Sequence, residues 1–192
     1  MCKENDRLNA FSYALEELVK IHKEKYGLSS IQEALKSFSN TRIMKLFYCL
    51  CLESIVIKNE IVSSIGLFEL FGCFYAFPNG PVLRDIYYIL DKVPGFKYED
   101  GHFSKYEDGH ISDMGVPDSY KILINDSVFK LFNNLGSGLF NDRNKLVELT
   151  HKLPLWRDAF LYKANKEMSI DPKDLKKEYD RYYSEIDIQR KK

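Results

Sequence analysis

The residues most suited to chemistry lie in a repeated octapeptide, KYEDGHFSKYEDGHIS, which spans residues 97–112. The two copies differ at one position, where the first has Phe103 and the second has Ile111. Each copy holds a tyrosine, two carboxylates, a glycine and a histidine. Carboxylate oxygens and imidazole nitrogens are zinc ligands, so the first question is whether the repeat is a duplicated metal site.

A zinc site needs three or four ligands that converge on one point. Asp100-Gly-His102 and Asp108-Gly-His110 supply enough ligands, but their spacing does not establish convergence, and no cysteine lies nearby. The same charges are equally typical of a solvated loop with two tight Asp-Gly turns. We therefore expect no metal, and we predict that residues 97–112 form an exposed hairpin or a mobile loop.

The cysteines and serines show no pattern typical of catalysis. Cys49 and Cys51 are two residues apart in a segment with helical periodicity, where their side chains would point about 200° apart. We interpret them as buried thiols that act as small hydrophobic groups. The chain has no Gly-x-Ser-x-Gly elbow, no Walker loop and no Gly-x-Gly-x-x-Gly. We expect neither a catalytic nucleophile nor a bound cofactor.

His151 is the strongest candidate for a general base, because it follows Thr150 inside an otherwise apolar segment. Glu148 stands three residues earlier on the same helical face. Pro154 breaks the helix, and a ring that hydrogen-bonds under this break would have a structural role, which is the interpretation we favour. Trp156 is expected to anchor the core, with one acceptor for its indole N–H.

Length and composition indicate a single globular domain. The chain has 192 residues, of which 45% are hydrophobic, and a formal net charge of zero. A neutral chain has no overall field that attracts nucleic acid or anionic lipid. The most apolar stretch, residues 65–77, contains Glu69 and is too short to span a bilayer. The N-terminus does not resemble a signal peptide, so the cysteines are expected to be reduced.

The hydrophobic periodicity predicts a mainly α fold: a single compact helical domain with a short β-hairpin or small sheet and a charged C-terminal helix. A first helix starts at a capping Asp6 and ends at Gly27, and a capping box at residues 29–32 starts a second. Asn40 or Thr41 is expected to cap a third helix, which is apolar almost all round and belongs at the centre of the core.

The middle of the chain is more irregular. Residues 61–77 predict one or two short strands, and Pro81 is expected at the first position of a helix. Residues 92–120 have no sustained period. Helices are predicted again from Asp126 to Leu135, from residue 141 or 142, and over residues 155–164.

The last predicted helix starts at a capping Asp171. Its apolar stripe should dock on the body of the protein; it consists of Leu175, Tyr179, Tyr182 and Ile186.

Three segments, taken in order, resemble the Panacea domain, also called the SocA-like or phage-associated GepA-like domain. Residues 41–48 (TRIMKLFY) are similar to the family's opening KLqKLLYfa. Residues 67–70, 74–82 and 85–87 are similar to its lfde…eAwkyGPVvpevY, and residues 146–156 are similar to its LSeLTH…pW. Residues 169–179 resemble the family's closing helix. The chain departs from the pattern at residues 77–79, where the family has an aromatic residue, a basic residue and tyrosine.

The resemblance divides the chain into an N-terminal helical extension (1–40), a Panacea-like domain (41–180) with an insertion loop at 92–120, and a charged tail (181–192). It implies an antitoxin, which binds a cognate protein toxin directly and in some cases delivers it to a protease. It also implies a cytoplasmic protein of a bacterium or of a phage-infected bacterial host, with no membrane partner.

The resemblance also assigns roles to residues. The central seam of the fold is expected to contain Gly80, Pro81, Val82, Thr150 and Trp156. A partner-facing groove is expected to contain Phe77, Asn79, Asp85 and His151.

Two alternatives to a toxin-binding protein stay open. One is a hydrolase that uses His151 with Asp85 or Glu148. The other is a phage-encoded protein that modifies the host and uses the same scaffold without a toxin. The neutral charge argues against DNA as a partner, although it leaves DNA binding by residues 1–40 open.

Overall fold

The computed structural model describes residues 4–106 and 115–191. The helices are α1 (Glu4–Tyr26), α2 (Ile31–Leu35), α3 (Asn40–Glu53), α4 (Phe68–Phe71), α5 (Arg84–Tyr87), the 3-10 helix η1 (Leu90–Lys92), α6 (Asp118–Asn141), α7 (Arg143–His151), α8 (Pro154–Tyr162) and α9 (Pro172–Arg190). The strands are β1 (Val56–Lys58), β2 (Ile61–Ser64), β3 (Tyr75–Phe77), β4 (Gly80–Val82), β5 (Phe96–Glu99) and β6 (His102–Lys105). In the described residues they pair as antiparallel hairpins β1–β2, β3–β4 and β5–β6. The predicted mainly α fold is confirmed.

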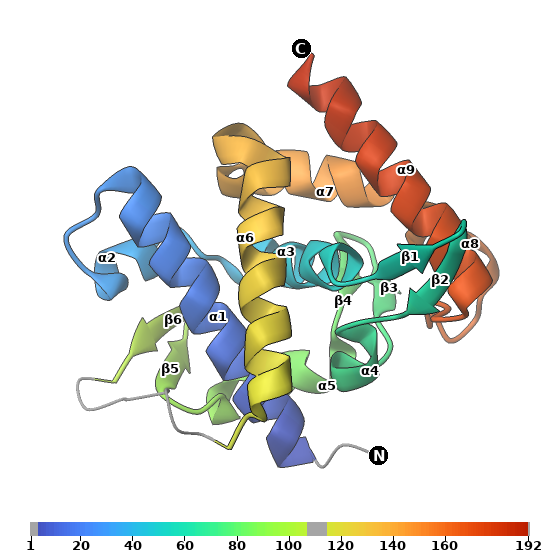
Figure 1. The fold of residues 1–192 in the computed structure, drawn as a ribbon. Helices are drawn as coiled ribbons and strands as arrows, with labels where there is room; N and C mark the ends of the chain where they lie inside the picture. Colours follow the sequence, from blue (N-terminus) through green and yellow to red (C-terminus); the bar gives the residue numbers. More distant parts are fainter. Residues whose placement is uncertain (1–3, 107–114, 192) are drawn as a thin grey trace.

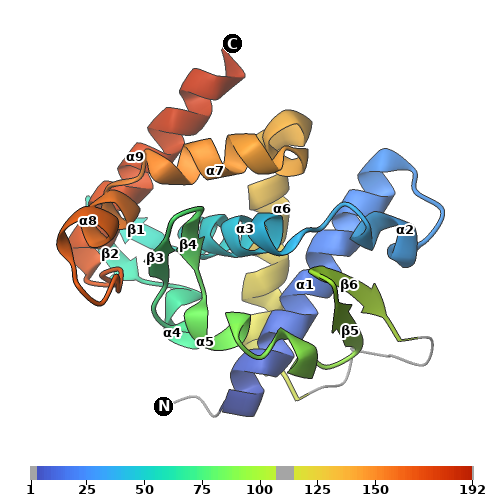
Figure 2. The ribbon, with the colours of Figure 1, turned by 180° about the vertical axis from the view of Figure 1, so that it is seen from behind.

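Helix α3 lies at the centre of the molecule, with α6 crossing it on one side and β3–β4 on the other (Figures 1 and 2). Every residue from Arg42 to Glu53 is buried, so the prediction of a central helix is confirmed. Its N-cap is Ser39, one residue before the predicted Asn40, and the Ser39 hydroxyl accepts from the Arg42 N–H at 3.4 Å.

The N-terminal helix α1 belongs to the same core as the rest of the chain. It lies against α6 (Figure 1), and its predicted apolar stripe, which includes Leu8, Leu15 and Leu18, is buried. The ring of Phe11 stacks on Phe47 of α3 with centroids 4.1 Å apart. Residues of the 1–40 segment therefore pack into the hydrophobic cluster that also holds α9.

The capping box at the start of α2 was predicted one residue too early. Ser30, not Ser29, is the N-cap, and its hydroxyl accepts from the Glu33 N–H at 3.0 Å. The Glu33 carboxylate in turn accepts from the Ser29 N–H at 2.8 Å. Gln32, the predicted partner, instead accepts from the Lys105 N–H, so a contact with β6 decides the register of the box.

Pro81 does not start a helix; this prediction was wrong. Pro81 lies in β4 and pairs with Ala76 of β3, while the following helix α5 begins at Arg84. A proline has no N–H to donate, so it is tolerated in a strand with an unpaired edge. The hairpin forms here because Pro78 and Asn79 make a two-residue connection between the strands.

Helix α6 starts eight residues earlier than predicted, at Asp118 rather than Asp126. Its first turns are held by tertiary contacts, because Ile124 is fully buried in the core. The helix was predicted to end at Leu135. Gly136, the next residue, is non-helical with a φ of 63°, but the helix then resumes and ends at Asn141.

The C-terminal helix α9 docks on the body of the protein, as its apolar stripe predicted. Leu175, Tyr182 and Ile186 are buried and Tyr179 is half-buried. The sequence analysis did not anticipate that the same face also buries the carboxylate of Glu178.

Two buried carboxylates join α3, α8 and α9. Glu178 accepts from the Tyr48 hydroxyl and from the Leu155 N–H at 2.8 Å. Glu53 accepts from three donors: the Tyr182 hydroxyl at 2.9 Å, the Tyr183 hydroxyl at 2.6 Å and the Asn134 amide at 2.9 Å. These bonds supply the partners that buried acids require.

The first copy of the repeat forms the hairpin β5–β6. Its turn consists of Asp100 and Gly101, both with positive φ (51° and 82°), which confirms the predicted Asp-Gly turn for this copy. Most of the second copy, residues 107–112, lies outside the described residues. The hairpin is not simply exposed, because Phe103 is buried and packs on Phe96 and Tyr98.

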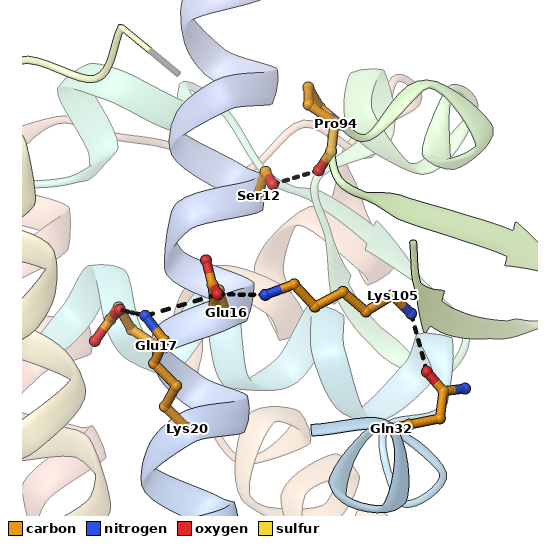
Figure 3. A network of polar contacts seen from close by, with 7 residues as sticks. All are labelled: Ser12, Glu16, Glu17, Lys20, Gln32, Pro94 and Lys105. Atoms are coloured by element: carbon orange, nitrogen blue, oxygen red, sulfur yellow. Dashed lines mark hydrogen bonds and ion pairs between the residues drawn. The ribbon is translucent and has the colours of Figure 1, made fainter. Parts of the chain in front are cut away.

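Polar contacts fasten this hairpin to α1 and α2 (Figure 3). The Lys105 ammonium lies 2.7 Å from the Glu16 carboxylate, and the Lys105 N–H donates to the Gln32 side-chain oxygen at 3.1 Å. The Ser12 hydroxyl donates to the Pro94 carbonyl just before β5. The irregular stretch predicted over residues 92–120 is thus partly ordered by α1.

Each helix in residues 4–106 and 115–191 is too short or too polar to cross a lipid bilayer.

Candidate functional site

The segments that carry the family resemblance meet at the β3–β4 hairpin. Figure 2 shows the hairpin across α3, with α7 above it and α8 beside it. Gly80 has a φ of 101°, and a Cβ at this position would lie 2.6 Å from Lys45 Cε and 2.8 Å from Thr150 Oγ1. A side chain at residue 80 would therefore be strained in its backbone and would collide with both neighbours.

Side chains from three helices hold the hairpin at its turn. The Trp156 indole N–H of α8 donates to the Phe77 carbonyl at 2.9 Å. The ring of His151, at the end of α7, lies beside the backbone of Pro78. The Lys45 ammonium of α3 donates to the Pro81 carbonyl at 2.8 Å.

Lys45 is the most unusual of these groups, because only 1% of its surface is exposed. Burial disfavours the charged form and lowers the pKa of Lys45 to about 7, against a small opposing effect of the Cys49 thiol. Its hydrogen-bond acceptor is a neutral carbonyl, and no ion pair among the described residues includes Lys45.

His151 stacks on Trp156, with ring centroids 3.9 Å apart and planes 12° apart. Burial, followed by the nearby Lys45 ammonium, lowers the pKa of His151, while the Pro78 backbone opposes the shift. The ring is therefore neutral near pH 7. Its Nε2 atom is buried and has no hydrogen-bond partner among the described residues.

A pocket of about 110 Å³ lies beside Lys45. Its walls are mostly apolar, and the side chains of Thr41, Lys45 and Asn79 complete them. The lining consists of Thr41, Met44, Lys45, Phe77, Pro78, Asn79, Val82 and Tyr87.

The structure brings together eight of the nine residues assigned by the resemblance. Gly80, Pro81, Val82, Thr150, His151 and Trp156 meet at the hairpin, and Phe77 and Asn79 line the pocket. Asp85 is separate from them. Its carboxylate lies 4.0 Å from Arg7 and 3.5 Å from Arg84, and 69% of its side chain is exposed.

Lys45 was not among the site residues predicted from the sequence. A signal was present, because Lys45 is a charged residue in the middle of a helix that was predicted to be apolar almost all round. A charged residue in such a helix is either buried or interrupts the apolar surface. If it is buried, its shifted pKa marks it as a candidate functional residue.

Within the part of the chain that the structure describes, no three His, Cys, Asp or Glu side chains gather where they could hold a metal ion. Asp100 lies in the β5–β6 turn, His102 begins β6, and Asp108 and His110 lie outside the described residues. Cys49 and Cys51 are free and buried, and burial raises the pKa of both thiols.

The carboxylates proposed to support a catalytic His151 have other contacts. Asp85 faces two arginines, as described above, and the Glu148 carboxylate accepts from the Lys152 ammonium at 2.8 Å. The stacking of the His151 ring on Trp156 is typical of a structural histidine. Comparison with known proteins adds no assignment: no protein-family model, curated protein or solved structure matches this chain.

Proposed function

We propose that this protein is an antitoxin-like binding protein, which neutralises a cognate protein toxin by direct contact at the β3–β4 turn. One observation carries the proposal: a turn held by three helices lies beside a pocket in which a buried cation, Lys45, has one acceptor among the described residues. A surface that is rigid, partly apolar and incompletely satisfied is suited to receive a partner.

The surroundings of the turn have the composition of a binding surface. Pro78 and Asn79 are exposed, and Phe77 and Tyr87 are half-buried at the pocket. Tyr88, the next residue, has 68% of its surface exposed. Aromatic side chains around a small pocket are frequent anchors in protein interfaces. Neutralisation would then follow from covering the toxin's own functional surface or from presenting the toxin to a protease.

The hydrolase alternative gains no support from the geometry. A general base needs a carboxylate or another group that orients it and an open path to substrate. His151 is instead stacked on Trp156, beside the Pro78 backbone. We therefore propose a binding protein rather than an enzyme.

The test is co-expression of this protein with the product of the adjacent gene in a bacterial host. We expect the wild-type chain to restore growth and to be captured with the toxin. Asn79→Arg places a large charged side chain on the exposed turn, so it should abolish rescue without changing thermal unfolding. Asn133→Arg, at an exposed position of α6, is the matched control and should rescue fully.

His151→Ala tests whether the support of the β3–β4 turn matters for toxin binding. It removes the stacking partner of Trp156, so it should weaken rescue while the protein stays folded. Full rescue by both Asn79→Arg and His151→Ala would exclude this surface as the toxin-binding site. An adjacent gene whose product is harmless would instead favour the host-modifying alternative.

A further inference from the structure

The Lys45 ammonium has unused capacity to bind. It carries three N–H donors, and among the described residues it donates to one acceptor, the Pro81 carbonyl. That acceptor is neutral, and the side chain is buried away from water. A buried cation without a counter-charge is unfavourable, and an anion that reaches it gains a strong, desolvated ion pair.

The pocket beside Lys45 has the size and lining for a small group. Its volume of about 110 Å³ corresponds to roughly three or four water molecules at ~30 Å³ each. Met44, Phe77, Val82 and Tyr87 supply apolar walls that would contact methylene groups. A single cation matches one negative charge, whereas a phosphate dianion would need further donors.

We propose that the Lys45 pocket binds a carboxylate, supplied by an acidic side chain that the partner protein inserts beside the β3–β4 turn. The carboxylate would accept from the free N–H groups of Lys45, and its methylene groups would contact the apolar walls. That a protein partner supplies the carboxylate rests on the proposed function. The binding of a carboxylate by the pocket does not depend on that function.

Carboxylate binding at Lys45 should depend on pH. Because burial lowers the pKa of Lys45 to about 7, the ammonium loses its proton above that pH unless an anion occupies the pocket. Carboxylate binding must therefore take up a proton in alkaline solution, and the affinity should fall about tenfold per pH unit above pH 7.

The groups that face Lys45 do not obscure this dependence. His151 of α7 has a lowered pKa, so its ring is neutral throughout the range above pH 7. Burial raises the pKa of Cys49, on α3 itself, so the thiol keeps its proton. The other contacts, Pro81 of β4 and Thr150 of α7, do not titrate. Tyr87 of α5 lines the pocket as an apolar ring.

The experiment measures binding of two probes to the full chain by titration calorimetry and NMR between about pH 6.5 and pH 9. The probes are sodium propionate and the peptide acetyl-Gly-Glu-Gly-amide, with acetyl-Gly-Gln-Gly-amide as the uncharged match. We expect both carboxylates to bind and the glutamine peptide to bind at least tenfold more weakly. Lys45→Met should abolish binding, and Lys145→Met, at an exposed position of α7, should leave it unchanged.

A second measurement needs no variant, so it holds even if Lys45→Met unfolds. The NMR titration midpoint of the Lys45 side chain should rise from about 7 when propionate saturates the pocket. A midpoint that propionate does not move would overturn the proposal, as would equal binding by the wild type and a folded Lys45→Met chain. Binding of propionate without the glutamate peptide would overturn the assignment to a partner's side chain.

The two proposals fail in different ways. If the wild-type chain rescues growth but neither carboxylate binds, the Lys45 proposal is wrong and the antitoxin function stands. If the carboxylates bind with the expected pH dependence but rescue fails with every adjacent gene product, the pocket stands and the antitoxin function is wrong.

Discussion

The charged groups buried on the two sides of α3 differ in how many of their possible hydrogen bonds are made. Toward α9, the Glu53 carboxylate accepts from three donors, and the Glu178 carboxylate accepts from the Tyr48 hydroxyl and the Leu155 N–H. Toward the β3–β4 hairpin, the Lys45 ammonium has one neutral acceptor within residues 4–106 and 115–191, and a pocket lies beside it. The first side is a closed network, and the second retains unused donors.

This difference separates stability from binding. A buried charge whose partners all come from the chain itself fixes the position of the elements that supply them. A buried charge with missing partners lowers the stability of the free protein, and a ligand can recover that loss. The α9 side is therefore interpreted as the structural side of α3, and the hairpin side as the functional one.

The largest expected effect is on the closed side. Glu53→Ala leaves two tyrosine hydroxyls and the Asn134 amide without their acceptor and creates a cavity, so unfolding free energy should fall by about 3–5 kcal/mol. Chemical denaturation measures this change. Asp180→Ala on the outer face of α9 removes an exposed pair with Lys176 and should cost less than about 1 kcal/mol. Equal losses in the two variants would contradict the comparison.

Glu178 should give the closed side a measurable pH dependence. Burial raises its pKa to about 7 from the ordinary 4.5, so the folded state holds a proton that the unfolded state releases. The resulting stabilisation is complete below about pH 4.5 and is lost as pH rises through about 7, a change of roughly 3 kcal/mol.

Glu178→Gln should remove this slope, because the amide can accept from Leu155 and donate to Tyr48 at every pH. Denaturation at several pH values between about 4.5 and 8 provides the measurement. Asp180→Asn, on the exposed face of the same helix, is the control and should keep the slope of the wild type. If the stability of the Glu178→Gln variant falls with pH as steeply as that of the wild type, other groups cause the slope.

Lys45 should make stability depend on pH in the opposite direction to Glu178. Its pKa is lowered to about 7 from 10.5, so the unfolded state binds the extra proton and stability rises with pH between these values. Lys45→Met should therefore raise stability by about 2 kcal/mol at pH 7, and the difference from the wild type should shrink toward pH 10. A clear loss of stability at pH 7 would show that Lys45 serves the fold and not a ligand.

The repeat offers a smaller test, away from both sides of α3. Deleting residues 97–104 or residues 105–112 yields two chains that differ at one position, Ile or Phe at the buried site of Phe103. The chain that keeps Phe should be more stable by about 1 kcal/mol, because isoleucine loses ring contacts with Phe96 and Tyr98. Thermal unfolding compares them. Identical stability would mean that the hairpin contributes no packing energy.

Local signals in the sequence predicted most of the helices. The stripes of α1 and α9, the apolar α3, the cap at Asp171 and the start of α7 after residue 141 or 142 all depend on residues close together in the chain. The errors occurred where distant contacts decide. Gln32 is engaged by Lys105 of β6, so the α2 capping box moves by one residue. Pro81 lies in a strand because Ala76 pairs with it and Lys45 binds its carbonyl.

The sequence by itself determined the mainly α fold and the central position of α3, because periodicity and capping act over a few residues. Only the tertiary structure decided that Lys45 is buried with one acceptor among the described residues, and that His151 stacks on Trp156. It also decided that Glu53 takes its donors from α6 and α9, and Glu178 from α3 and α8. The strength of a buried charge depends on every group around it, and those groups come from elements that are far apart in the chain.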